Sequence, residues 1–210
     1  MKRRFQRSFL LATVLLISGL PITLAQQLGG GLSIGSVGLT ERAGAASISG
    51  GGLLFGIKGF YTLDGLLSED IDVRASGALE FGGVSRSDDG VTVDVGSLFH
   101  LLLAGDAIYT YSVSQDFSAY GGGGLRLGYG SFTRNRNLSR GSDDADFGGV
   151  FLGLGLIGGG QFSITSELGI FAEIDLSLNL LSPSEDFGNE REVSYGGFLP
   201  KLTIGVVYKI

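Results

Sequence analysis

The sequence contains no cysteine and no tryptophan, and it has only 3 prolines in 210 residues. Without cysteine the chain can form neither disulfides nor thiolate-ligated metal sites, and no lipid anchor can be attached to a cysteine. Charged residues are also scarce, at 17% of the chain, while hydrophobic residues make up 43%. A disordered chain normally has the opposite balance, so this composition predicts a folded protein.

Glycine is the residue in excess. The chain has 38 glycines, which is about 18% of its length and more than twice the ordinary level of about 7%. These glycines show no three-residue period, which excludes a collagen helix. The length itself predicts a single domain.

The first 25 residues have the layout of a secretory signal peptide. Four basic residues precede an apolar run from Phe9 to Ile22, and the run ends in a small-x-small cleavage site at Thr23 to Ala25. The run holds about 14 residues, short of the roughly 20 that a membrane-spanning helix needs. We therefore predict a mature chain of residues 26–210. Its 11 basic and 21 acidic residues make nucleic acid an unfavourable partner.

An alternation of apolar and other residues, with a period of two, runs through the predicted mature chain. Between Leu168 and Leu180 every even position is apolar, whereas the odd positions are mostly glycine or polar. A strand places all of these apolar side chains on one face, and a helix would scatter them around its surface. The same split recurs in the segments 71–81, 91–103, 150–156 and 202–210.

The alternating segments predict eight strands, which we place near 28–38, 45–62, 69–85, 91–113, 118–134, 147–164, 167–181 and 193–210. Most exceed the 9 to 11 residues that a tilted strand needs to cross a bilayer. The connections after strands two, four and six are short, and those at 135–146 and 182–192 are long and polar. Outer-membrane barrels combine short periplasmic turns with long outer loops. The predicted fold class is therefore all-β, an eight-stranded antiparallel up-and-down transmembrane β-barrel.

Large aromatic side chains are predicted on the apolar face, at the periplasmic ends of the strands. An amphipathic ring is well placed at the level of the lipid headgroups, so these residues favour an apolar face that points outward to lipid. The predicted membrane-interface aromatics are Tyr61, Tyr109, Tyr111, Phe162 and Tyr208.

The opposite face combines glycines with ionisable side chains whose charges nearly balance. Eight strands leave a lumen just wide enough for side chains, where glycine makes room for long neighbours and buried charges need partners. The predicted lumen charge network consists of Lys58, Arg74, Glu80, Asp94, Asp106, Arg126, Glu173, Asp175 and Lys201, with Asp72 and Lys209 on the same face. The basic residues outside the lumen, such as Arg42, fall on the outer side, where they could hold lipid phosphates or pair with loop carboxylates.

With these features the chain resembles the small eight-stranded outer-membrane barrels, the family that includes the transmembrane domain of outer membrane protein A, its X-type relatives and adhesin-like barrels. The resemblance covers residues 26–210. The ending Tyr208-Lys209-Ile210 is similar to the family's terminal aromatic-x-Phe insertion signal, with Ile210 in place of the usual Phe. The resemblance implies a bacterial outer-membrane location and recognition by the barrel assembly machinery during insertion.

Two motifs do not carry the chemistry that they suggest. Gly153 to Gly158 matches the G-x-G-x-x-G dinucleotide fingerprint, but here a strand continues through Ile164 and no helix opens. The acidic segments 88–90 and 142–146 lack the ligand spacing of an EF-hand and are interpreted as solvated loops. We therefore predict no cofactor and no metal site.

Four functions are considered. A lipid-modifying barrel enzyme would use a Ser-His pair at the lipid surface, but the single histidine, His100, is predicted inside the lumen. A structural or surface-binding barrel would contact outer-membrane lipid, lipopolysaccharide or another surface through its outer loops. A narrow channel for water or small ions and a soluble lipocalin-like carrier are the alternatives. A lumen filled by side chains favours the surface-binding barrel, which we expect to be a monomer and not an enzyme.

Overall fold

The structure, a computed structural model, describes residues 26–43, 46–68, 70–88, 91–134, 147–181, 184–186, 191–195 and 197–210. The predicted signal peptide, the loop at 135–146 and most of the loop at 182–192 lie outside these residues.

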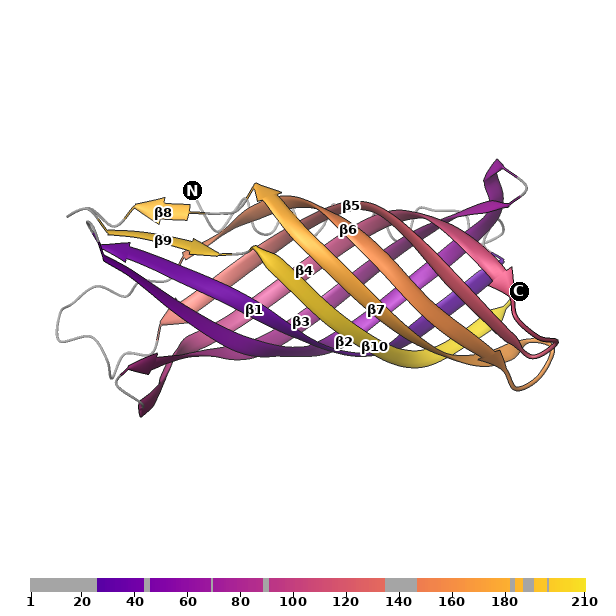
Figure 1. The fold of residues 1–210 in the computed structure, drawn as a ribbon, viewed down its shortest axis with the longest axis horizontal. Coiled ribbons are helices and arrows are strands. Elements are labelled where there is room, and N and C mark those ends of the chain that lie inside the picture. The colour runs from indigo at the N-terminus through magenta and orange to yellow at the C-terminus, as the bar shows by residue number, and fades with distance from the viewer. Residues whose placement is uncertain are drawn as a thin grey trace.

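Antiparallel strands close into a barrel (Figure 1). They are β1 (Gln27–Ala43), β2 (Ala46–Ser68), β3 (Ile71–Asp88), β4 (Val91–Ser112), β5 (Phe117–Arg134), β6 (Phe147–Ser163), β7 (Leu168–Leu181), β8 (Ser184–Asp186), β9 (Arg191–Tyr195) and β10 (Phe198–Lys209). From β1 to β7 each strand pairs with the next along the chain, and β10 joins β7 to β1. The predicted fold class, a closed eight-stranded antiparallel barrel, is confirmed.

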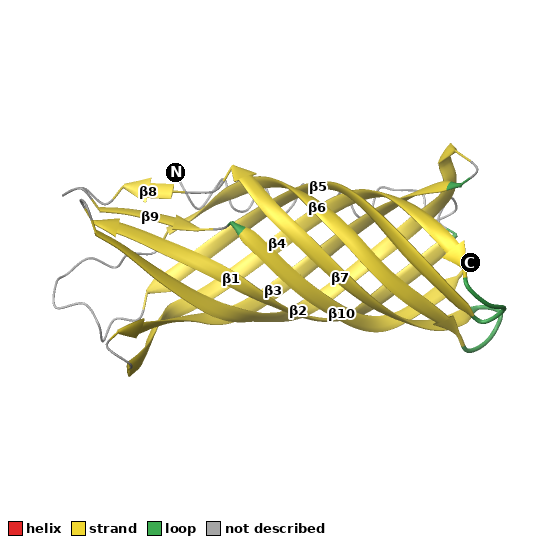
Figure 2. Cartoon of the chain, viewed as in Figure 1, coloured by secondary structure: helices red, strands yellow, loops and turns green. Residues whose placement is uncertain are grey.

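The ends of the barrel differ. The C-terminus and the short turns lie at one end, and the long tips of β1 and β2 lie at the other, together with β8 and β9 (Figure 1). We assign the end with the short turns to the periplasm. No helix in the described ranges is long and apolar enough to cross a membrane, and strands run along the whole barrel in Figure 2.

The eighth predicted strand, 193–210, is divided into β9 and β10. Both strands pair with β1. β10 pairs with the first half of β1, and β9 pairs with Leu39 to Ala43 of β1. Between them Gly197 has φ +94°, a conformation that glycine adopts without steric cost. Because β1 runs to Ala43, past its predicted end at 38, its edge needs backbone partners. The start of the predicted loop 182–192 supplies one more strand, β8, which pairs with β9.

The hairpin between β2 and β3 also differs from its prediction. The second strand is predicted to end near residue 62 in a short connection, but β2 continues to Ser68. Pairing with β3 is regular as far as Leu63 and resumes only at Ser68. Gly65 has φ +63°, and its N–H donates to Oδ1 of Asp72 at 3.0 Å. The Asp-Gly pair therefore bends a wider hairpin in place of a tight turn.

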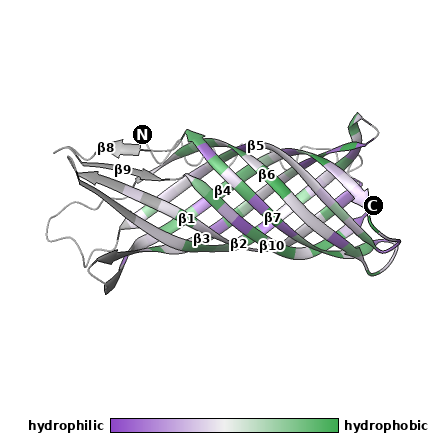
Figure 3. Ribbon diagram, in the orientation of Figure 1, coloured by the Kyte–Doolittle hydropathy of each residue, from purple (hydrophilic) through white to green (hydrophobic). Residues whose placement is uncertain are grey.

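The two faces of the strands separate as the alternation predicts. Along β7 the odd positions up to Ser177 are buried and the even positions are exposed, and Figure 3 shows the same alternation of hydropathy along the ribbon. The outward apolar positions extend from Ile71 to Phe81 on β3 and from Phe99 to Tyr109 on β4, where Tyr109 is exposed, Phe99 is half-buried and Leu101 is buried. This is about the length that a tilted strand needs to cross a bilayer. The apolar face therefore points outward, which contradicts the lipocalin-like alternative.

Glycines on the inner face make room for the largest lumen side chains. A Cβ added at Gly155 would lie 2.5 Å from Cζ of the Arg126 guanidinium, and a Cβ at Gly128 would overlap the ring of Phe151. Both large side chains are fully buried. Each one therefore occupies space that exists because the neighbouring strand has glycine at that position, which is how so narrow a barrel holds an arginine and a phenylalanine.

This packing predicts that Gly155→Ala destabilises the barrel by about 1 to 3 kcal/mol, because the added methyl displaces the buried Arg126. The matched control is Gly105→Ala, where an added Cβ meets no atom within 4 Å and the change should stay within about 0.5 kcal/mol. Urea unfolding of the refolded proteins in lipid vesicles measures both effects. Equal stability of the two variants would contradict the packing argument.

The outward apolar face generates a second prediction. Ile174 is 53% exposed near the middle of β7, and Ile164 is 56% exposed at a periplasmic turn. Arginine should cost about 2 to 4 kcal/mol at Ile174, inside the lipid, and about 0 to 1 kcal/mol at Ile164, near the interface. The free energies of unfolding of Ile174→Arg and Ile164→Arg in vesicles test this difference. A larger loss for Ile164→Arg would place the membrane elsewhere on the barrel.

Candidate functional site

The middle of the lumen is filled by a balanced set of charged side chains. In the part of the chain that the structure describes, four basic and four acidic side chains are buried there. They are Lys58, Arg74, Arg126, Lys201, Glu80, Asp106, Glu173 and Asp175. We call these eight residues the ion-pair layer. Buried charges are tolerated where each has a partner of opposite sign and hydrogen bonds that satisfy it.

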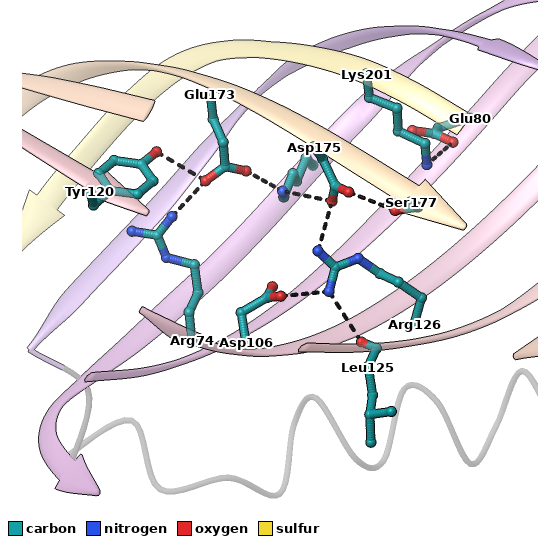
Figure 4. A network of polar contacts seen from close by, with 11 residues as sticks. Arg74, Glu80, Asp106, Tyr120, Leu125, Arg126, Glu173, Asp175, Ser177 and Lys201 are labelled. Atoms are coloured by element: carbon teal, nitrogen blue, oxygen red, sulfur yellow. Dashed lines mark hydrogen bonds and ion pairs between the residues drawn. The ribbon is translucent and has the colours of Figure 1, made fainter. Parts of the chain in front are cut away.

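Glu173 of β7 connects the periplasmic part of the ion-pair layer. One carboxylate oxygen accepts a hydrogen bond from Nζ of Lys58. The other accepts from Nη1 of Arg74 at 2.6 Å and from the hydroxyl of Tyr120 at 2.9 Å (Figure 4). The three donors come from β2, β3 and β5. One carboxylate therefore ties four strands together across the lumen.

Aromatic rings support Arg74. Its guanidinium carbon lies 4.3 Å from the ring centre of Phe60 and 4.5 Å from that of Tyr120. Its Nε donates to the hydroxyl of Thr62 at 3.2 Å. A guanidinium held over aromatic faces and bound by a carboxylate has little freedom to move. Arg74 and Tyr120 therefore close the lumen rigidly at this level.

Arg126 connects the next part of the ion-pair layer. Its Nη1 donates to Oδ1 of Asp106 at 2.6 Å, and its Nη2 lies 3.3 Å from Oδ2 of Asp175 (Figure 4). The hydroxyl of Ser177 donates to the other oxygen of Asp175 at 2.6 Å. The Arg126 side chain is fully buried. Because solvent does not reach its guanidinium, the Asp106 and Asp175 carboxylates compensate the positive charge.

His100 marks the outer boundary of the ion-pair layer. Its Nδ1 lies 2.6 Å from Oε2 of Glu80, and Nζ of Lys201 donates to the same oxygen at 2.8 Å. The imidazole stacks on the ring of Phe151 at 4.8 Å between ring centres. His100 has no exposed surface. It is therefore enclosed in the lumen and has no contact with lipid.

The outer part of the lumen is apolar. Buried side chains of one cluster fill it, consisting of Val37, Leu54, Val84, Leu98, Phe132, Phe151 and Leu199, and the cluster continues through Ala78 and Leu102 just to the periplasmic side of Glu80 and His100. We call this cluster the apolar plug. The apolar plug is not among the sequence predictions, because glycine and charge are the features by which the sequence marks the inner face. The available signal is a segment such as Val150 to Leu152, where both alternating faces are apolar at the outer end of a strand.

At the periplasmic end the lumen opens into a cavity of about 190 Å³. We call it the periplasmic vestibule. Arg74 of the ion-pair layer and the neighbouring Tyr120 line its inner end, and Asp72 and Lys209 line it nearer the mouth. Asp72 and Lys209, both predicted on the inner face, therefore belong to the vestibule. Within the described ranges no cluster of His, Asp and Glu has the geometry to hold a metal ion.

Asp94 is the predicted lumen charge that the structure places elsewhere. It is exposed, and it lies opposite Ser85 in the pairing of β3 with β4. The next pair along the strands is Val84 with Gly96, so Val95 is an extra residue. One extra residue reverses the alternation beyond it and turns Asp94 away from the lumen. A bulge of this kind leaves no mark in the period of two.

The predicted interface aromatics lie on the outer surface near the periplasmic end. Tyr109, Tyr111, Phe162 and Tyr208 are exposed, and Tyr61 is half-buried. The hydroxyl of Tyr208 donates to Glu167 at 3.1 Å. The predicted insertion signal, Tyr208 with Ile210, occupies the end of the barrel wall, where the Ile210 N–H donates to the Gln26 carbonyl at 2.9 Å. Recognition of these two residues by the assembly machinery stays a prediction.

A second aromatic row lies on the outer surface at the other edge of the apolar band. Phe55, Phe81 and Phe99 are successive partners across β2, β3 and β4, and the last two rings are 5.2 Å apart. Aromatic residues at both edges are typical of outer-membrane barrels. The predicted interface aromatics cover only the periplasmic edge, although these phenylalanines have the outward parity and lie about one membrane crossing from that edge.

No protein-family model and no curated protein sequence matches the chain. Among solved structures, the outer membrane protein OprG of Pseudomonas aeruginosa matches with a TM-score of 0.57 and 15% identity, over 89% of this chain and 96% of OprG. A major outer membrane protein of Thermus thermophilus matches with a TM-score of 0.53 and 15% identity, over 85% of this chain and 99% of that protein. The attachment invasion locus protein Ail of Yersinia pestis matches with a TM-score of 0.42 and 16% identity, over 87% and 98% of the two chains.

The chain therefore has the fold of the small outer-membrane barrels, and the predicted resemblance is confirmed at the level of the fold. OprG and the Thermus thermophilus protein are both described as outer membrane proteins. This fold and the outward apolar band agree with the predicted outer-membrane location.

The ion-pair layer generates a third prediction. Glu173→Ala leaves Lys58 and Arg74 buried without their carboxylate, so it should destabilise the barrel by about 3 to 5 kcal/mol. The control is Asp94→Ala. The period of two predicts Asp94 in the lumen as it does Glu173, but Asp94 is exposed, so its loss should change the free energy of unfolding by no more than about 0.5 kcal/mol. Both are measured by urea unfolding in vesicles. If Asp94→Ala destabilised the barrel as much as Glu173→Ala, the distinction between the two carboxylates would be wrong.

Proposed function

We propose that this protein is an outer-membrane β-barrel with a closed lumen, which anchors a surface-contact structure built by the outer ends of its strands. The observation that carries the proposal is that the outer lumen is filled by the apolar plug while β1 and β2 continue past the lipid. The proposal includes a non-enzymatic role and a monomeric state.

The closed lumen is supported by two successive barriers. An ion entering from the periplasm meets the ion-pair layer, where the charges are already paired. Beyond this layer it meets the apolar plug, with Phe132 and Phe151 among the buried side chains. Moving an ion into such surroundings without a partner costs several kcal/mol or more. These barriers favour an anchor over a channel.

The surface-contact role is supported by the length of the β1–β2 hairpin. The two strands pair over 17 residues of β1, from Gln27 to Ala43. At about 3.3 Å per residue and a tilt of about 40°, this is roughly 43 Å along the barrel axis, against an apolar band of about 25 Å. The hairpin starts at the periplasmic end, so the excess extends beyond the outer face of the membrane. β9 and β8 continue the sheet there.

The proposed partners follow from these surfaces. Outer-membrane lipid surrounds the apolar band, and lipopolysaccharide or another polymer of the cell surface meets the projecting sheet. The barrel assembly machinery is the proposed partner during insertion, through Tyr208 and Ile210. The net negative charge of residues 26–210 makes nucleic acid an unfavourable partner.

The narrow channel is kept as a second candidate because the vestibule is polar and open to the periplasm. Its polar walls lead to Arg74 and Tyr120. Conduction would require both the ion-pair layer and the apolar plug to open. An enzyme of the Ser-His type is not proposed, since the single histidine of the chain is enclosed between Glu80 and Phe151.

A shortened hairpin tests the surface-contact role. Gly38 and Gly51 are partners in the β1–β2 ladder, so residues 39–50 can be replaced by an Asn-Gly turn, which suits a two-residue hairpin. The barrel below should fold, and capture of the protein by immobilised lipopolysaccharide should weaken at least about tenfold, which corresponds to about 1.4 kcal/mol.

The control for this experiment shortens the hairpin at the other end of the barrel, with residues 64–67 replaced by Asn-Gly. It should leave capture by lipopolysaccharide unchanged. Equal capture of the full-length protein and the variant without residues 39–50 would contradict the proposed contact.

A further inference from the structure

The periplasmic vestibule has a lining that neither the anchor role nor the closed lumen requires. Its cavity of about 190 Å³ is formed by the periplasmic ends of several strands and closed at its inner end by Arg74 and Tyr120. Among the described residues that line it, only Ile108 and Phe117 are apolar. An apolar ligand would therefore find almost no surface to cover.

Hydroxyl and amide groups dominate the lining. The hydroxyl groups belong to Thr62, Thr110, Ser112, Ser114, Ser118 and Ser163, and the amides belong to Gln27, Gln115 and Gln161. Each of these groups can both donate and accept hydrogen bonds. A ligand that presents several hydroxyl or amide groups is the chemical class that matches such a lining.

The charges in the vestibule compensate one another. Arg74 is bound by the Glu173 carboxylate at 2.6 Å. Asp72 accepts a hydrogen bond from the Gly65 N–H at 3.0 Å. Asp116 and Lys209 line the cavity with opposite charges. The lining holds two acidic residues, Asp72 and Asp116, and two basic residues, Arg74 and Lys209, so neither sign is in excess and a neutral ligand is favoured.

The hydrogen-bonding groups are held on paired strands. Ser112 of β4 lies opposite Ser118 of β5, and Ser118 in turn lies opposite Gln161 of β6. On the other side of the mouth Gln27 lies opposite Thr62. A ladder of backbone hydrogen bonds fixes these positions, so a ligand does not have to order the backbone when it binds.

We propose that the periplasmic vestibule binds a neutral saccharide. A cavity of this size holds about six water molecules at about 30 Å³ each, which is the space of one sugar ring. Sugar hydroxyls would replace the hydrogen bonds that these waters make with the Ser, Thr and Gln side chains. Because the vestibule faces the periplasm, the sugar is either a free oligosaccharide or part of a cell-wall glycan strand.

The test is a binding titration with two neutral disaccharides, maltose and the N-acetylglucosamine dimer. The full mature protein is refolded in a zwitterionic detergent that has no sugar headgroup, and binding is followed by calorimetry and by ligand-observed NMR. We expect saturable binding of at least one disaccharide at concentrations up to about 10 mM, an affinity typical of few contacts. Glucose 6-phosphate, the charged comparison, should bind at least tenfold more weakly.

Two variants place the binding in the vestibule. Ser118→Phe fills the cavity and should weaken binding at least tenfold, while Ala119→Phe, its neighbour on β5 with the opposite parity, should leave binding unchanged. Ser112→Phe is the second filling variant if Ser118→Phe does not refold. No saturable binding, equal affinity in the filled variants, or tighter binding of the phosphate sugar would each overturn the proposal.

The same titration separates the two sources. Binding of both disaccharides points to free oligosaccharides, and binding of the N-acetylglucosamine dimer alone points to the cell-wall glycan. The vestibule is lined by residues at the short-turn end of the barrel, and the projecting hairpin lies at the opposite end (Figure 1). Loss of saccharide binding therefore leaves the proposed surface contact intact, and failure of that contact leaves the vestibule proposal intact.

Discussion

The structure depends on one steric constraint, the narrow lumen that eight strands enclose. Each large side chain in the lumen needs space, and glycine on a neighbouring strand provides it, as Gly155 does for Arg126 and Gly128 for Phe151. The glycine content of the chain, unusual for a globular protein, follows from this constraint. The same constraint requires the lumen charges to pair with one another, because little space remains for water.

These requirements divide the barrel along its axis. The polar vestibule opens to the periplasm, the ion-pair layer crosses the middle, and the apolar plug closes the outer part of the lumen. Outside the lumen the strands continue as a projecting sheet. The outer face of the wall is in contact with lipid. The two proposed contacts lie at opposite ends of the barrel, with a cell-surface polymer at the outer end and a neutral saccharide at the periplasmic end. Because the lumen between them is filled, neither proposed contact requires a channel through the protein.

The sequence predicts the barrel because its strongest signal, the alternation with a period of two, is also the feature that a barrel wall imposes. The side on which Glu173 and Asp175 lie can be counted from Leu168 without any structure. Asp94 fails the same count because one extra residue in β4 reverses the parity. The vestibule could not be predicted, since residues such as Ser112, Ser118 and Gln161 are ordinary polar residues until the barrel closes and brings their strands together.

Single-channel conductance in a planar lipid bilayer tests the closed lumen most directly. The refolded protein, residues 26–210, should insert without discrete current steps at any salt concentration. A variant with both Phe132→Ala and Phe151→Ala, which opens the apolar plug, should show a leak above this baseline, whereas Phe81→Ala with Phe99→Ala on the lipid face should not. Discrete steps in the unmodified protein that grow with salt concentration would contradict the account and identify the lumen as a wet pathway.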